Sequence, residues 1–108
     1  MARVHDVTIS IDGGIAKATN VPSAKLGDKV NWINTTADDA IVFFPHDGVF
    51  GAGSLHFHHT IPSGKPFQPK KAIVKQLVKK RICNYAIWCQ ESMSFAIGNS
   101  DPEIIVET

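Results

Sequence analysis

The feature that most constrains the fold is a two-residue alternation of apolar and polar side chains, which recurs in short segments. Near the start, Val7, Ile9 and Ile11 alternate with polar residues, and a glycine pair at 13–14 ends the pattern. This period places successive side chains on opposite faces of a strand. The segment is therefore expected to be a half-buried strand followed by a turn.

Similar segments follow along the rest of the chain, separated by turn signals. They cover residues 29–34, 40–44, 55–61, 82–89 and 103–108. Residues 40–44 are apolar on both faces, as in a central strand whose outer side is covered by a loop or a partner. Residues 72–78 also fit helical spacing, but their β-branched content favours a strand. About seven short strands without a convincing long helix predict an all-β fold, an antiparallel β-sandwich.

The 108 residues provide enough chain for one domain with one core, expected to span 1–108. Within it, Val30 and Trp32 share one strand face, and a buried Trp32 is expected. Tyr85, Ile87 and Cys89 share one face of a later strand. No apolar run is longer than that of residues 40–44, which is far shorter than the roughly 20 residues of a membrane-spanning helix, so no transmembrane segment is expected.

The two cysteines, Cys83 and Cys89, are expected to be free thiols. Six strand residues span about 20 Å, whereas bridged Cα atoms lie within about 7 Å of each other. A catalytic role for Cys89 is not expected, because its neighbours Gln90 and Glu91 would not stabilise a thiolate. A buried, apolar cysteine at a strand end is the simpler interpretation.

The net charge of +1 conceals an uneven distribution of charge. Six of the eleven Lys and Arg residues lie between Lys70 and Arg81, a segment without acidic residues, so it carries +6 and the remainder −5. This polarity can orient an acidic protein partner. Alternatively, the lysines protect a solvated edge strand from aggregation. No nucleic-acid partner is expected, since no aromatic residues for base stacking are interleaved.

Three motifs occur in a fixed order over most of the chain. Residues 27–34 (GDKVNWIN) look like a Gly-Asp-x-Val-x-aromatic-x-Asn signature, and residues 85–89 (YAIWC) look like a Tyr-x-aromatic-x-Cys strand. Residues 61–67 are similar to the turn that leads into the next pair of strands. Together these motifs resemble the cupredoxin family, small copper-binding proteins that include plastocyanin. The resemblance implies a cupredoxin-like, Greek-key β-sandwich.

The resemblance also implies where a copper site would lie. A type 1 site uses two imidazoles and a thiolate, with a weak axial ligand such as methionine. Cys89 matches the ligand cysteine, but the two histidines would fall at Ala40 and Ser92. Met93 follows Cys89 by four residues, which is shorter than the usual interval to the axial methionine. The resemblance therefore implies a degenerate type 1 copper site.

A non-enzymatic binding or interaction module is the function that these residues favour. The alternative is a copper-dependent electron-transfer protein with altered ligation, in which Cys89 and Met93 recruit a histidine from residues 46–59. Family resemblance implies a periplasmic or extracellular protein, yet the first six residues carry charge and lack the apolar stretch of a secretory signal. Open sheet edges also leave an oligomer possible.

Histidines supply a second candidate metal site, away from the family's positions. His56 and His58 lie two residues apart on one strand face, about 6.6 Å apart along the chain. With His46 or Asp47 as a third ligand, such a nitrogen-rich site suits copper, zinc or nickel. The simpler interpretation is that the pair lines a solvated face. His59, if it faces the core, is expected to be buried and hydrogen-bonded.

Overall fold

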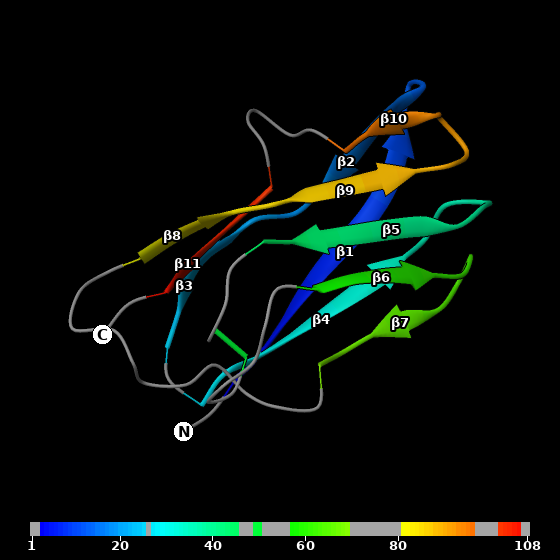
Figure 1. The fold of residues 1–108 in the computed structure, drawn as a ribbon. Helices are drawn as coiled ribbons and strands as arrows, with labels where there is room; N and C mark the ends of the chain where they lie inside the picture. Colours follow the sequence, from blue (N-terminus) through cyan, green and yellow to red (C-terminus); the bar gives the residue numbers. More distant parts are fainter. Residues whose placement is uncertain are drawn as a thin grey trace.

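The computed structural model describes residues 3–25, 27–45, 49–50, 57–69, 81–96 and 102–106. Within these ranges the chain forms eleven strand segments and no helix (Figure 1). They are β1 (Val4–Asp12), β2 (Ile15–Ala18), β3 (Val21–Ala24), β4 (Lys29–Asn34), β5 (Ala40–Phe44), β6 (Phe57–Ile61), β7 (Pro66–Phe67), β8 (Arg81–Asn84), β9 (Ala86–Cys89), β10 (Ser94–Phe95) and β11 (Glu103–Val106). The predicted all-β class is confirmed.

The strands form two four-stranded sheets and one three-stranded sheet. Their orders are β2-β1-β4-β7, β10-β9-β5-β6 and β3-β11-β8. Because β2 leads into β3 and β8 leads into β9, the small sheet lies at one end of the two larger ones (Figure 1). Most neighbouring strands are antiparallel, but β1 with β4 and β3 with β11 are parallel. The predicted β-sandwich is confirmed, with these two parallel pairs as exceptions.

Backbone breaks divide some of the predicted strands, which is why the segments outnumber the roughly seven expected. Tyr85 lies between β8 and β9, and its N–H donates to the Pro102 carbonyl at 3.1 Å. The side-chain alternation continues through this break. Tyr85, Ile87 and Cys89 are all buried, so the face predicted for them is confirmed.

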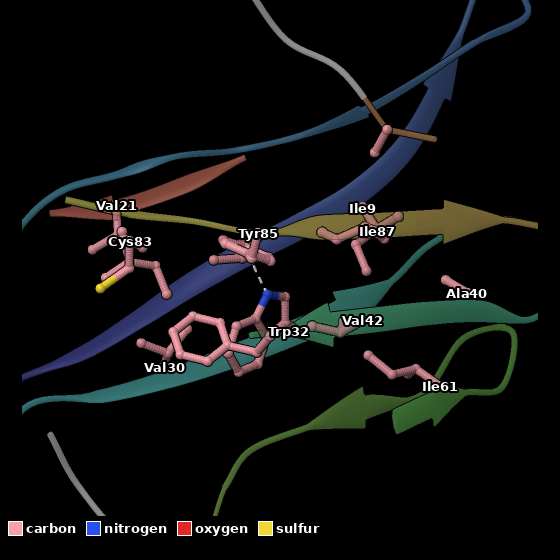
Figure 2. Packing of buried hydrophobic residues seen from close by; sticks show 14 of the residues in the cluster. Ile9, Val21, Val30, Trp32, Ala40, Val42, Ile61, Cys83, Tyr85 and Ile87 are labelled. Atoms are coloured by element: carbon pink, nitrogen blue, oxygen red, sulfur yellow. Dashed lines mark hydrogen bonds between the residues drawn. The ribbon is translucent and has the colours of Figure 1, made fainter. Parts of the chain in front are cut away.

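Trp32 is the centre of the core and is completely buried, as predicted. Five aromatic rings have centroids between 5.9 and 6.4 Å from its own: Phe44, Phe50, Phe57, Phe67 and Tyr85. The Trp32 Nε1–H donates to the Tyr85 hydroxyl at 3.0 Å, the dashed line in Figure 2. The indole therefore buries a large apolar surface while its one polar atom stays hydrogen-bonded.

Strand β5 is apolar on both faces, as its sequence predicts. Ala40, Val42 and Phe44 point into the core and are at most 1% exposed. Ile41 is half-buried, and Phe43 is 39% exposed on the opposite side of the sheet. An apolar row therefore remains on the outer face of this sheet.

Two predicted features lie outside the described residues. They are the strand expected over residues 72–78 and all of the basic segment from Lys70 to Arg81 except Arg81, which begins β8. Both stay predictions. Among the residues that the structure describes, no helix is long and apolar enough to cross a membrane.

A buried carboxylate fixes the start of β1 to the turn before β4. Asp28 accepts hydrogen bonds from the backbone N–H of Arg3 and of Lys25, both at 2.9 Å, and lies 2.7 Å from His5 Nε2. Burial by itself would raise the pKa of Asp28, but these hydrogen bonds outweigh it and lower the pKa to about 2. His5, to which no pattern in the sequence assigns a role, is therefore a structural residue.

Acid is expected to weaken the fold through Asp28. Its folded-state pKa of about 2 lies below the ordinary 3.8, so its contribution is complete above about pH 4 and is lost as the pH falls toward 2. The contribution is at most about 2 kcal/mol. Urea unfolding of an Asp28→Asn variant at pH 7 should show this loss, and the variant's stability should depend less on pH between 4 and 2. The exposed Asp12→Asn is the control, and an equal effect there would contradict the assignment.

Candidate metal centre around Cys89

Cys89 is the last residue of β9 and lies between two neighbouring strands. Ala40 is opposite Cys89 on β5, and Ser94 is opposite it on β10. Directly opposed residues have Cα atoms about 4.5–5.5 Å apart. Ala40, where the resemblance implies the first imidazole, is therefore beside the thiol, and both residues are completely buried. Ala40 therefore occupies the position implied for the first histidine ligand, but its methyl side chain has no donor atom.

The turn after Cys89 also lacks strong copper ligands. The Ser92 hydroxyl, at the position implied for the second histidine, lies 2.8 Å from the Ser94 hydroxyl and 3.4 Å from the Cys89 carbonyl oxygen. Met93 adopts a left-handed backbone conformation with φ of 48°, and the residue is 70% exposed. The hydroxyl of Ser92 thus has partners within the turn, and Met93 lies mostly in solvent.

Burial and a nearby negative charge both disfavour the thiolate form of Cys89. Burial raises the pKa of the Cys89 thiol, and the negative charge of Glu91 raises it further. A copper ligand or a nucleophile must be a thiolate, which a nearby cation would favour. Cys83 is buried as well, and neither cysteine forms a disulfide, as expected.

The loop that leads to Ala40 is held in place by the buried side chain of Asn34. Its amide nitrogen donates to the carbonyls of Asp38 and Ile61, both at 2.8 Å. Its oxygen accepts the Thr36 N–H at 2.9 Å and the Thr36 hydroxyl at 2.6 Å. Asn34 follows Val30 and Trp32 at the inward positions of β4. A polar residue at an inward position of a strand is the sequence feature that could have indicated this buried hydrogen-bond network.

The same loop contacts the turn after Cys89. The Gln90 N–H donates to the Asp39 carbonyl at 3.0 Å, and the Ala37 N–H donates to a Glu91 carboxylate oxygen. These bonds join the two segments that flank the Ala40 and Cys89 pair. The surroundings of the thiol are therefore set by backbone contacts and apolar packing.

The described histidines lie away from Cys89. His58 is opposite Phe43, with ring centroids 6.3 Å apart, and is exposed on the outer face of the sheet. His59 stacks on Phe67 at 3.8 Å, and it is exposed rather than buried as expected. The reason is that β6 is the last strand of its sheet, so an inward-facing side chain there reaches only the rim of the core.

The order of the strands separates His58 and His59 from the Cys89 thiol. Strand β5 lies between β6 and β9, so two strand spacings, about 9.6 Å, separate the outer pair. Among the described residues, no group of three or more His, Cys, Asp or Glu side chains could hold a metal ion. His46, Asp47 and His56 lie outside the described residues, so the His56 and His58 site stays a prediction.

The donors that the described residues place around Cys89 do not fit a type 1 copper ion. Such a site needs two imidazoles and a thiolate in a plane. The described neighbours of the thiol are a methyl group at Ala40 and hydroxyls at Ser92 and Ser94. This mismatch follows from the chemistry of the side chains themselves.

Comparisons with known proteins identify the fold. No family model and no curated protein matches the chain. A solved structure of a methionine-to-alanine mutant of amicyanin with Cu(I) is similar, with a TM-score of 0.53 and 20% sequence identity. The match covers 98% of this chain and 82% of that chain. Amicyanin is a cupredoxin, so this chain has a cupredoxin-like fold, and at this identity the similarity concerns the fold alone.

Proposed function

We propose that this chain is a non-enzymatic, cupredoxin-like binding module with a degenerate type 1 copper site. The observation that carries the proposal is the pairing of Ala40 with Cys89 in adjacent strands, both fully buried. An alanine has no donor atom, so the one thiol at the family's position lacks its nearest nitrogen ligand. A fold does not determine a function, and a copper site is a small feature on a sandwich that its core stabilises.

The state of the thiol and of the following turn supports the same proposal. Burial and Glu91 raise the pKa of Cys89 and so disfavour its thiolate form, and the hydroxyl of Ser92 is a weak ligand for copper. Met93 would have to leave solvent to serve as an axial ligand. Electron transfer through copper would need these groups rearranged together, whereas a binding module needs none of them.

A copper carrier with altered ligation would need a histidine close to Cys89. The described histidines nearest in sequence, His58 and His59, lie two strands away on β6. The described residues therefore give this alternative no support. An acidic partner for the segment from Lys70 to Arg81, and a copper, zinc or nickel site at His56 and His58, remain predictions.

Copper titration tests the proposal. Cu(II) added to reduced protein without a histidine tag should give no intense visible absorption from thiolate-to-copper charge transfer, because Ala40 has no donor atom and no imidazole of the described residues lies beside Cys89. The Cys89→Ser variant, which replaces the thiol by a hydroxyl of similar size, should give the same spectrum as the wild type. An intense band in the wild type that is missing in Cys89→Ser would overturn the proposal.

A further inference from the structure

Residues 34–36 (Asn-Thr-Thr) form an Asn-x-Thr triplet, which is the acceptor sequence for N-linked glycosylation. Such a triplet is ordinarily expected on a surface loop, because a glycan is bulky and hydrophilic. Asn34 is instead completely buried, and Thr36 is buried with it. The sequence of the triplet and its place in the fold therefore conflict.

Both protons of the Asn34 amide are engaged inside the protein. The amide nitrogen carries two protons and donates to the carbonyls of Asp38 and Ile61, both at 2.8 Å. The orientation of the amide is fixed, because a carbonyl can only accept, and the Thr36 N–H that points at Asn34 Oδ1 can only donate. The folded protein thus presents no free N–H at Asn34.

Two connecting segments hold Asn34 inside the protein. Residues 35–39 lead from β4 to β5, and residues 62–65 join β6 to β7 (Figure 1). The second segment is bound to the backbone of Asn34 itself, since the Gly64 N–H donates to the Asn34 carbonyl at 2.8 Å and the Asn34 N–H donates to the Lys65 carbonyl at 3.1 Å. A sugar ring on the Asn34 side chain would have to displace these segments.

The chemistry of glycosylation is incompatible with the contacts of the buried amide. The side-chain nitrogen forms a bond to the first carbon of a sugar, the bond from that carbon to a lipid diphosphate breaks, and the nitrogen loses one proton. The modified nitrogen keeps a single N–H. At least one of the carbonyls of Asp38 and Ile61 would then lose its donor, and a buried carbonyl without a partner is strongly unfavourable.

We propose that Asn34 is an N-glycosylation acceptor only while the chain is unfolded, and that a glycan attached there prevents the chain from folding. The donor is a lipid-diphosphate-linked oligosaccharide. Folding and glycosylation at Asn34 exclude each other, so the folded protein carries no glycan at this triplet. The inference goes beyond the proposed function, since it does not depend on whether Cys89 binds copper.

Translation of the full chain behind a cleavable signal sequence tests the proposal, in the presence of microsomes that hold an oligosaccharyltransferase and its lipid-linked donor. The chain enters the microsomes unfolded, and a fraction should gain a glycan that an endoglycosidase removes. Limited proteolysis after lysis should degrade the glycosylated molecules roughly tenfold faster, or more, than the unglycosylated ones. Purified, folded protein mixed with detergent-solubilised microsomes should gain no glycan.

Asp6→Asn provides the matched control, because it gives residues 6–8 the same kind of triplet at an exposed position of β1. It is combined with Thr36→Val, which removes the triplet at residues 34–36 and keeps Asn34. Thr36→Val alone should gain no glycan, and circular dichroism of the purified variant verifies its fold. In the double variant, molecules with and without the glycan should be degraded at the same rate.

Two results would overturn the proposal. Glycosylated wild type that resists the protease as well as unglycosylated wild type would show that the fold accommodates a glycan at Asn34. A wild type without any glycan, in microsomes that glycosylate the double variant, would show that Asn34 is not an acceptor. Neither result bears on the copper titration, which uses the purified protein without any glycan.

Discussion

Replacing Trp32 by alanine is expected to lower the free energy of unfolding by about 3–5 kcal/mol. The indole is completely buried and contacts aromatic rings from both large sheets, Phe67 on β7 and Phe44 on β5 among them. Its removal leaves a cavity between the sheets, and it also leaves the Tyr85 hydroxyl without its donor. Urea unfolding followed by circular dichroism measures the loss.

Trp88→Ala is the matched control for this prediction. Trp88 is only partly buried, lies on the outer side of its sheet and contacts Phe95. Its replacement should cost about 1 kcal/mol. If Trp32→Ala leaves no folded state, Trp32→Phe keeps most of the apolar surface and should lose about 1–3 kcal/mol. Equal losses at the two tryptophan positions would contradict a core centred on Trp32.

Replacing Asn34 by alanine is expected to cost about 2–4 kcal/mol, because it leaves buried polar groups unpaired. The carbonyl of Ile61 and the N–H of Thr36 both lose a partner. The loop that leads to Ala40 would loosen at the same time. Alkylation of Cys89 should then become faster than in the wild type, since its burial depends on this loop.

Asn31→Ala is the control for the Asn34 variant. Asn31 lies on the same strand but faces solvent, and its side chain makes one hydrogen bond to Asp6 at 3.3 Å. Its replacement should change the stability by about 0.5 kcal/mol or less. Losses that agree between Asn34→Ala and Asn31→Ala would show that the buried network contributes nothing.

The alternation of side chains was sufficient to predict the strands and most of the core. Trp32 and the inward face of Tyr85, Ile87 and Cys89 follow from a two-residue period, which is a local property of the chain. The two parallel strand pairs do not follow from it. Pairing joins residues far apart in sequence, such as Val4 with Lys29, and no local pattern specifies which strands become neighbours.

For the single residues His59 and His5, too, the local sequence pattern could not predict the contacts that they make. The period placed His59 on the inward face of its strand, but it could not show that the strand is at an edge, where an inward ring is still exposed. His5 meets Asp28 across 23 positions of sequence. Neither His59 nor His5 belongs to a motif that would have indicated its contacts in the structure.

The candidate site around Cys89 was located from the motifs of the chain. Comparison with the cupredoxin pattern placed an alanine where the first imidazole belongs, and the structure puts Ala40 opposite Cys89. The burial of the thiol and the effect of Glu91 on its pKa both follow from local sequence, because Cys89 lies on the inward face of its strand and Glu91 is two residues away. His46 and His56 lie outside the described residues, and their role stays a prediction.

The most direct measurement of the copper chemistry is a crystal structure of the protein grown with Cu(II), with anomalous diffraction recorded at the copper absorption edge. The expected result is no anomalous peak within bonding distance of Cys89 Sγ, with Ala40 still packed beside the sulfur. A peak bonded to that sulfur and to two imidazole nitrogens would contradict the proposed loss of the type 1 site.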